Sequence, residues 1–288
     1  MRFEFIAKHR GIWPVTWMCE ALDVSPSGFY SWRSRPPSDR AVYDETLIRD
    51  IRRSFKDSDR TYGVRRIWPD LLDWGHEIGR ERVARLVRSL GLIAQPKRRR
   101  RPVDGGKRLE SSIAPNTLDR EFTATAPNQK WVADFTYVWT MEGWLYVAGV
   151  LDLFSRRLVG WSMKSRMTAD LVTDALIMAI WRRRPDTELL HHSDQGSQYT
   201  AEQFQRLLAD NGIECSMSRS GECHDNAVME SFFSRMKDDR ISRRRYRTRD
   251  EARADIFDYI ERFYNPKRRH STLGGLSPVE YEKRAKQA

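Results

Sequence analysis

Cysteine is scarce in this sequence of 288 residues, and long apolar runs are missing from it. Cys19, Cys215 and Cys223 are widely spaced, with no Cys-x-x-Cys pair and no His-x-x-x-His pair to complete a zinc site. We therefore expect a reduced compartment and no structural zinc. No run of about eighteen apolar residues occurs, and the start of the chain carries charges where a signal peptide would be apolar. These absences predict a cytoplasmic protein without a membrane span.

Negative charge is in the minority. The chain has 51 Lys and Arg residues against 40 Asp and Glu residues, which gives a formal net charge of +11. This balance favours a polyanionic partner, and nucleic acid above others. Composition alone leaves open an acidic lipid partner or a ribosomal accessory role. The length indicates one catalytic-sized domain with smaller modules beside it.

The first predicted unit, residues 1–36, is a helix-turn-helix-like leader. Ser25 is a good N-cap residue, and Pro26 follows at the first helical position. The short helix after them would serve as a recognition helix, with Arg33 and Arg35 beside it for phosphates. An ordinary pair of scaffold helices explains the same pattern, and the sequence does not decide between the two.

A second helical DNA-binding module is predicted over residues 43–96. Its clearest helix runs from about residue 80 to residue 90, where an apolar stripe is backed by arginines and Gly91 closes the helix. Pro69 interrupts a helix that would otherwise span residues 63–74. We expect that helix to kink or to start late.

A basic linker is predicted over residues 97–127. It opens with consecutive positive charges and continues with proline, glycine and polar residues. A solvated basic segment explains this composition, and a basic arm that follows DNA phosphates explains it equally well. The candidate DNA-binding residues of this segment are Lys97, Arg98, Arg99 and Arg100.

The third unit, residues 128–245, begins where strand-like runs of Trp, Val, Tyr and Phe begin. Thr200 and Gln203 suggest a capping box for one of its helices. The order of elements predicts an α/β domain with a mixed five-stranded sheet and flanking helices. The expected strands cover residues 131–139, 144–151, 158–163, 188–192 and 213–217, and the expected helices cover 168–183, 200–211 and 226–237.

Three acidic residues lie where this layout would gather them. Asp134 is inside the first strand, Asp194 follows the fourth, and Glu230 is one turn into the last helix. A carboxylate in an apolar strand is costly unless it pairs with a cation or faces a site. Asn226 and Lys237 share the helix face of Glu230. Amide, carboxylate and ammonium groups on one face are typical of a site for metal and phosphate.

A resemblance to a known family rests on four segments in a fixed order. The segments are Trp131–Tyr137, Leu151–Arg156, His192–Tyr199 and Asp225–Phe233. Together they resemble the integrase catalytic core of bacterial insertion-sequence transposases, which is related to the retroviral integrases. The resemblance is specific to the DDE transposases of the insertion sequence three family, second-frame product, and includes the 35 residues between the second and third acids.

The resemblance implies a ribonuclease-H-like fold whose first and fourth strands are neighbours. Asp134, Asp194 and Glu230 would then be the catalytic and metal-binding residues, holding two Mg²⁺ or Mn²⁺ ions. The implied reaction is metal-dependent cleavage and strand transfer of insertion-sequence DNA ends. Lys237 would contact a phosphate, and Asn226 would orient either Glu230 or the DNA.

The family also implies partners. These are transposon-end and target DNA, a first-frame protein of the same element or a frameshift fusion with it, and a multimer assembled on DNA in the bacterial nucleoid. Two other functions stay open. One is a non-catalytic DNA-binding regulator, and the other is a ribonuclease-H-like nuclease that cuts without joining.

A basic helical C-terminal extension is predicted over residues 246–288. Arg243, Arg244 and Arg245 precede it, and Lys267, Arg268 and Arg269 lie within it. Since Tyr246 and Tyr264 are interleaved with these charges, we expect DNA contact through phosphates and stacking on frayed bases.

Two further features near the acids are assigned outside the metal site. Asp152 is interpreted as a turn former at a strand end. His191 and His192 alternate along their strand, so at most one faces the acids, and we favour a hydrogen-bonding role over metal ligation.

Overall fold

The computed structural model describes residues 1–94, 114–185, 188–218 and 226–287. The candidate DNA-binding residues Lys97, Arg98, Arg99 and Arg100 lie outside the described residues, so their role stays a prediction. The predicted domain boundaries also stay predictions.

The first three helices form a small unit with its own apolar core. Ser25 caps the third helix, because its Oγ accepts a hydrogen bond from Gly28 N at 3.0 Å, and Pro26 follows as predicted. Ile6 and Phe29 are the fully buried residues between the helices. The first helix was not among the predicted elements. The helices are α1 (Arg2–His9), α2 (Val15–Ala21) and α3 (Pro26–Ser34).

A second helical unit follows, with α4 (Asp39–Asp57), α5 (Val64–Asp73) and α6 (Arg80–Ser89) around a shared core. The predicted late start of α5 is wrong, because the helix begins directly after Gly63 and contains Pro69. A proline there removes one helical hydrogen bond. Burial of Ile67 and Leu71 on the packed face of α5 holds the helix together across this gap.

The third unit is built on the mixed five-stranded sheet that the sequence predicted. The strand order is β3-β2-β1-β4-β5, and the first and fourth strands are neighbours. β1 pairs antiparallel with β2, and β2 with β3, whereas β1 to β4 and β4 to β5 are parallel. The strands are β1 (Lys130–Thr140), β2 (Gly143–Asp152), β3 (Leu158–Lys164), β4 (Leu189–Ser193) and β5 (Ile213–Met217).

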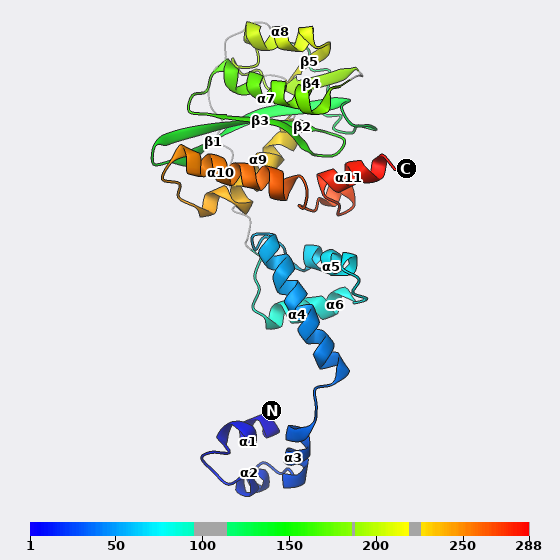
Figure 1. Ribbon diagram of the computed structural model, residues 1–288, viewed down its shortest axis with the longest axis vertical. Helices are drawn as coiled ribbons and strands as arrows, with labels where there is room; N and C mark the ends of the chain where they lie inside the picture. Colours follow the sequence, from blue (N-terminus) through cyan, green and yellow to red (C-terminus); the bar gives the residue numbers. More distant parts are fainter. Residues whose placement is uncertain (95–113, 186–187, 219–225, 288) are drawn as a thin grey trace.

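Helices cover both faces of the sheet (Figure 1). On one face lie α7 (Ala169–Arg183) and α8 (Glu202–Asp210), and on the other lie α9 (Ala227–Asp239) and α10 (Arg249–Asp258). Alternate residues of β1 therefore belong to different cores: Trp131 packs with the α7 side and Val132 with the α9 side.

The predicted capping box of α8 is wrong. Ala201 is the N-cap residue, and no side chain caps the helix. Thr200 belongs to the preceding turn, where its backbone N–H donates to Gly196 O. The helix therefore starts one residue too late for Thr200 to cap it.

The last helix, α11 (Pro278–Ala285), is fastened to the sheet by one buried carboxylate. Glu282 accepts hydrogen bonds from Ser155 Oγ at 2.7 Å, from Arg157 Nη1 at 2.7 Å and from both terminal nitrogens of Arg183 at 2.9 Å. Between α10 and α11 the chain forms a π-helical segment, Tyr259–Tyr264, and a short 3₁₀ helix, Ser271–Leu273. Another 3₁₀ turn, Ile241–Arg243, follows α9.

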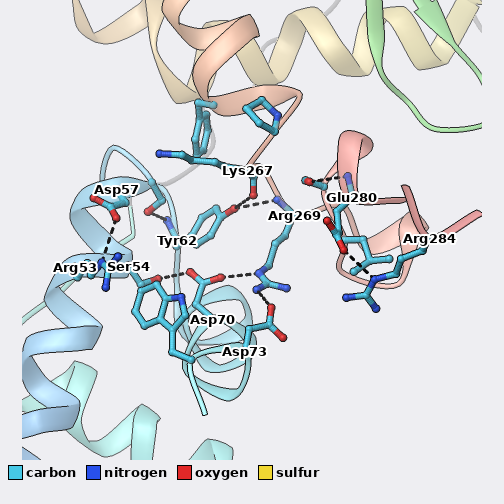
Figure 2. Close-up of a pocket in the computed structure, with 16 residues that line it drawn as sticks. Arg53, Ser54, Asp57, Tyr62, Asp70, Asp73, Lys267, Arg269, Glu280 and Arg284 are labelled. Carbon is cyan, nitrogen blue, oxygen red and sulfur yellow. Dashed lines mark hydrogen bonds and ion pairs between the residues drawn. The ribbon is translucent and has the colours of Figure 1, made fainter. Parts of the chain in front are cut away.

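Polar contacts join the second helical unit to the C-terminal segment (Figure 2). The Tyr62 hydroxyl donates to Lys267 O at 3.2 Å and accepts from Arg269 N at 2.9 Å. The Arg269 guanidinium pairs with Asp70 at 2.6 Å and also with Asp73. These groups line a cavity of about 440 Å³ that contains none of the three candidate acids.

The DNA contact expected of Arg268 is wrong, because its side chain is buried and pairs with Asp239 at 2.8 Å. The Arg269 side chain forms ion pairs with two acids of α5, whereas Lys267 is exposed. In the part of the chain that the structure describes, no helix is long and apolar enough to cross a membrane.

We predict that Gly160→Ala destabilises the fold. A Cβ at this position of β3 would lie 2.1 Å from Ala175 O and 2.8 Å from the Ala179 side chain, so α7 would have to move off the sheet. Overpacking of this kind costs about 1–3 kcal/mol. Urea unfolding followed by circular dichroism measures it. Gly11→Ala, where nothing lies within 4 Å, is the control, and equal stability of both variants would contradict the account.

Candidate active site

The pairing of β1 with β4 brings two candidate acids to neighbouring positions. The last paired positions are Val132 and His192, and the two strands run in the same direction. Asp134 and Asp194 each lie two residues further along their chains. Two aspartates that the sequence separates by sixty positions therefore lie next to each other at the end of the parallel pairing.

Asp134 is half-buried on β1, and its surroundings disfavour a negative charge. Burial is the largest cause, followed by the charge of Asp194 and then that of Glu230, and together they raise the pKa of Asp134 to about 8. Phe135 N opposes the shift by donating to Asp134 Oδ1 at 2.8 Å, and Lys237 opposes it weakly. Asp134 is thus close enough to both other acids to be affected by their charges.

Asp194 is held by the loop that follows β4. Its Oδ1 accepts a hydrogen bond from Gly196 N at 2.9 Å. A Cβ on residue 196 would lie 2.9 Å from that same oxygen and 3.1 Å from Gln198 Oε1. Only glycine allows so close an approach. Sequence reasoning gave Gly196 no role, although the Asp-x-Gly order in its motif was a signal for such a turn.

Two contacts fix α9, which carries Glu230, against the sheet. Asn226 is at the N-cap position of the helix and is buried, and its Nδ2 donates to Ala133 O at 2.9 Å, one residue before Asp134. On β2, Gly149 leaves room for the Met229 side chain, which a Cβ at residue 149 would approach to 3.2 Å. Glu230 itself lies in the first turn of α9 and is exposed.

Lys237 lies two turns further along α9. Its Nζ is 5.2 Å from the centre of the Tyr137 ring, which is on β1. The structure therefore places Lys237 close enough to Asp134 to lower its pKa, with its ammonium group over an aromatic ring three residues further along β1.

The two histidines of β4 differ in their surroundings. His192 Nδ1 and Ser216 Oγ are hydrogen-bonded at 2.9 Å, as expected for a hydrogen-bonding role. His191 packs against Tyr199 and Phe204, and burial lowers its pKa to about 3, so the ring is neutral.

Asp152 lies outside the site, as predicted. It is fully buried and accepts hydrogen bonds from Asn128 N and Phe154 N, both at 2.8 Å, and it pairs with Arg183 at 3.4 Å.

The stacking role predicted for Tyr246 and Tyr264 is wrong, because both side chains are buried. The Tyr246 hydroxyl donates to Asp255 Oδ2 at 2.6 Å, and the Tyr264 hydroxyl donates to Arg156 O at 3.0 Å. Both tyrosines belong to the core under α10. Neither ring can meet a DNA base.

The arginines after α9 are placed differently. Arg243, Arg244 and Arg245 are exposed, as DNA contact would require. Arg244 also pairs with Asp255 at 2.7 Å. Their role as DNA contacts remains a prediction.

The fit of a metal ion follows from the chemistry of the acids. Among the described residues, no three Asp, Glu, His or Cys side chains lie close enough to form a complete set of protein ligands for one ion. Mg²⁺ commonly takes only one or two carboxylates and completes its shell with water and phosphate oxygens. The raised pKa of Asp134 is the mark of a carboxylate that a nearby cation would stabilise. The residues present therefore fit a divalent ion of this open kind.

We predict that Asp134→Asn stabilises the metal-free protein in alkaline buffer. The pKa of Asp134 in the folded state is about 8, above the value of about 4 in an unfolded chain. Wild-type stability therefore falls as the pH rises between these values, and the variant escapes this loss. Thermal unfolding should show a higher melting temperature for the variant at pH 8, and the difference should vanish near pH 4.

Glu214→Gln is the matched control, because it removes the charge of an exposed strand acid on β5. This variant should leave the stability nearly unchanged at both pH values. If Asp134→Asn were destabilising at pH 8, the account of charge repulsion would be refuted.

Comparison with known proteins adds family matches that cover most of the chain. Residues 124–223 match an integrase core domain, residues 211–278 match a second integrase core model, and residues 42–100 match an HTH-like domain. The last match coincides with α4 to α6.

Two solved structures with low similarity are retroviral. The HTLV-2 integrase catalytic core domain, in complex with magnesium, gives a TM-score of 0.43 at 15% identity over 56% of this chain and 99% of that chain. The catalytic core domain of BIV integrase gives 0.42 at 22% identity over 56% of this chain and 97% of that chain.

Curated relatives match over almost their full length. The "Insertion element IS600 uncharacterized 31 kDa protein" of Shigella sonnei is 44% identical over 93% of this chain and 98% of its own. The "Transposase InsF for insertion sequence IS3A" of Escherichia coli K12 is 40% identical over 98% of both chains. With its integrase core, its HTH-like domain and this level of identity, the chain belongs to the IS3 family of insertion-sequence transposases.

Proposed function

We propose that this transposase cleaves the DNA ends of its insertion sequence and joins them to target DNA, with Asp134, Asp194 and Glu230 as its catalytic residues. The observation that carries the proposal is the parallel pairing of β1 with β4, which brings Asp134 and Asp194 to neighbouring positions. Three acids from β1, the loop after β4 and α9 act on one another although the sequence separates them widely. Such a cluster on an integrase core is what polynucleotidyl transfer requires.

Asp134 and Asp194 would hold the divalent metal, Mg²⁺ or Mn²⁺ and two ions in all, with Glu230 completing the ligand set. When bound, the ions supply an activated water or DNA 3′-hydroxyl as nucleophile and stabilise the departing oxygen. Asp134 would have to lose its proton before it could act as a ligand, because the neutral acid is favoured below about pH 8.

The other residues of the site position these groups. Asn226 ties the start of α9 to the backbone beside Asp134, so it would orient Glu230 rather than touch DNA. Gly196 lets its own N–H reach Asp194 Oδ1 and so fixes that carboxylate. Lys237 would bind a phosphate near the cleaved end.

DNA binding would extend beyond the acids. Arg243, Arg244 and Arg245 are exposed next to α9 and would contact phosphates, as would the basic segment Lys97–Arg100. We further propose a first-frame protein of the element, or a fusion with it, as partner, a multimer on DNA, and a location in the bacterial cytoplasm at the nucleoid.

Glu230→Gln should abolish strand transfer. The assay follows the joining of labelled, pre-cleaved transposon-end DNA with Mg²⁺ or Mn²⁺ and the first-frame partner present. We expect a loss on the order of a hundredfold or more, because the amide cannot replace the charge. Glu214→Gln, which changes an exposed acid on β5, is the matched control and should retain activity.

Other outcomes of this assay identify the alternatives. No metal-dependent cleavage or joining by the wild type would favour a DNA-binding regulator. Cleavage of an RNA–DNA hybrid without joining would favour a nuclease.

Gly196→Ala should reduce the same activity by about a hundredfold, because a displacement of about 1 Å at a reacting group has an effect of this size. The added Cβ would push the Asp194 carboxylate from its place. Gly79→Ala, at a position with open space, should keep activity. A fully active Gly196→Ala variant would show that the placement of Asp194 by this turn is unimportant.

A further inference from the structure

A groove of about 620 Å³ lies beside the β1–β2 hairpin, and no predicted role accounts for the exposed aromatic residues that line it. β1 and β2 supply one wall, and the end of α9 with the segment after it supplies the other. The residues that matter most are three aromatic ones, Tyr137, Trp139 and Trp144, and three basic ones, Lys237, Arg244 and Arg245.

The aromatic wall is unusually exposed. The exposed fractions are 54% for Tyr137, 59% for Trp139 and 42% for Trp144. The Trp144 ring meets the Tyr137 ring at 4.9 Å and the Trp139 ring at 4.8 Å, both edge to face. The three rings therefore support one another and keep much of their surface open to a ligand.

The opposite wall is basic. Lys237, Arg244 and Arg245 line it, and no acid is found among the described lining residues. Lys237 also reaches across the groove to the face of Tyr137, at 5.2 Å. Aromatic rings facing cationic side chains form the combination that binds bases and phosphates together.

The groove lies further along the two elements that carry Asp134 and Glu230. Tyr137 is three residues beyond Asp134 on β1, and Lys237 is two helical turns beyond Glu230 on α9, although none of the three acids lines the groove. A DNA strand bound at the acids would therefore have to extend along these elements to reach the aromatic wall.

We propose that this groove binds single-stranded DNA, with unpaired bases stacked on Tyr137, Trp139 and Trp144 and phosphates held by the basic wall. The occupant would be the strand that separates from the duplex beside the cleaved end. Single-stranded DNA is favoured over duplex DNA because the aromatic wall would stack on the faces of bases. In a duplex these faces are covered by the neighbouring base pairs. The identity of this strand rests on the proposed function, whereas binding of single-stranded DNA to the groove can be measured without catalysis.

The test measures the affinity for a labelled oligothymidine of about twelve nucleotides by fluorescence anisotropy, without divalent metal. Trp139→Ala should weaken binding by about tenfold, and Trp139→Phe should largely restore it, because stacking needs only an aromatic ring. Trp181→Ala is the matched control, because Trp181 is 72% exposed on α7 and does not line the groove. Affinity for a duplex of equal length should change little in Trp139→Ala.

Arg245→Gln provides a second readout that does not depend on packing. It should lower the slope of log affinity against log salt by roughly 0.7, as expected for one lost phosphate contact on a single strand. Equal oligonucleotide affinity of Trp139→Ala, Trp181→Ala and wild type would overturn the proposal. So would a loss of self-association in Trp139→Ala on sedimentation, which would make the groove an interface between copies.

The two proposals can fail separately. If the wild type binds the oligonucleotide as expected but joins no DNA ends, the catalytic proposal fails and the groove assignment stands. If joining depends on Glu230 but Trp139→Ala leaves oligonucleotide binding unchanged, the groove assignment fails and the catalytic proposal stands.

Discussion

β1 and β4 run parallel at the centre of the sheet, and their pairing places two carboxylates side by side at one end of the pair. Burial and mutual repulsion make this arrangement costly for the folded protein, as the raised pKa of Asp134 records. The rest of the core compensates. Helices pack on both faces, and Asn226 ties α9 to β1 by a backbone contact. The repelling carboxylates are thus held in place by the packing of the surrounding helices and by this contact.

Much of this arrangement could be predicted from the sequence, for a physical reason. Alternating and continuous apolar runs reveal strands because side-chain direction has a fixed period, and all five strands were found within a few residues. The strand order came from the family resemblance, because no local pattern encodes which strands pair. The candidate acids were named by the same resemblance together with their spacing.

The errors concern burial and close contacts, which depend on the tertiary structure. Tyr246 and Trp139 are both aromatic residues near basic ones, yet one is buried against Asp255 and the other is exposed. Composition cannot separate them. Gly196 was missed because its importance lies in a close tertiary contact: a Cβ on this residue would lie only 2.9 Å from Asp194 Oδ1. Thr200 was wrongly predicted as a cap because the N-cap of the helix is the next residue, Ala201.

The Glu282 carboxylate has one more consequence. It is the last Asp or Glu in the sequence, and it neutralises Arg157 and Arg183, which lie more than ninety residues earlier. A copy of the element with a premature stop before α11 would leave the largely buried Arg183 guanidinium with only its 3.4 Å contact to Asp152 as an ion pair, which would destabilise the core. The catalytic core would then fold poorly, so truncated copies would tend to inactivate themselves rather than compete for DNA ends.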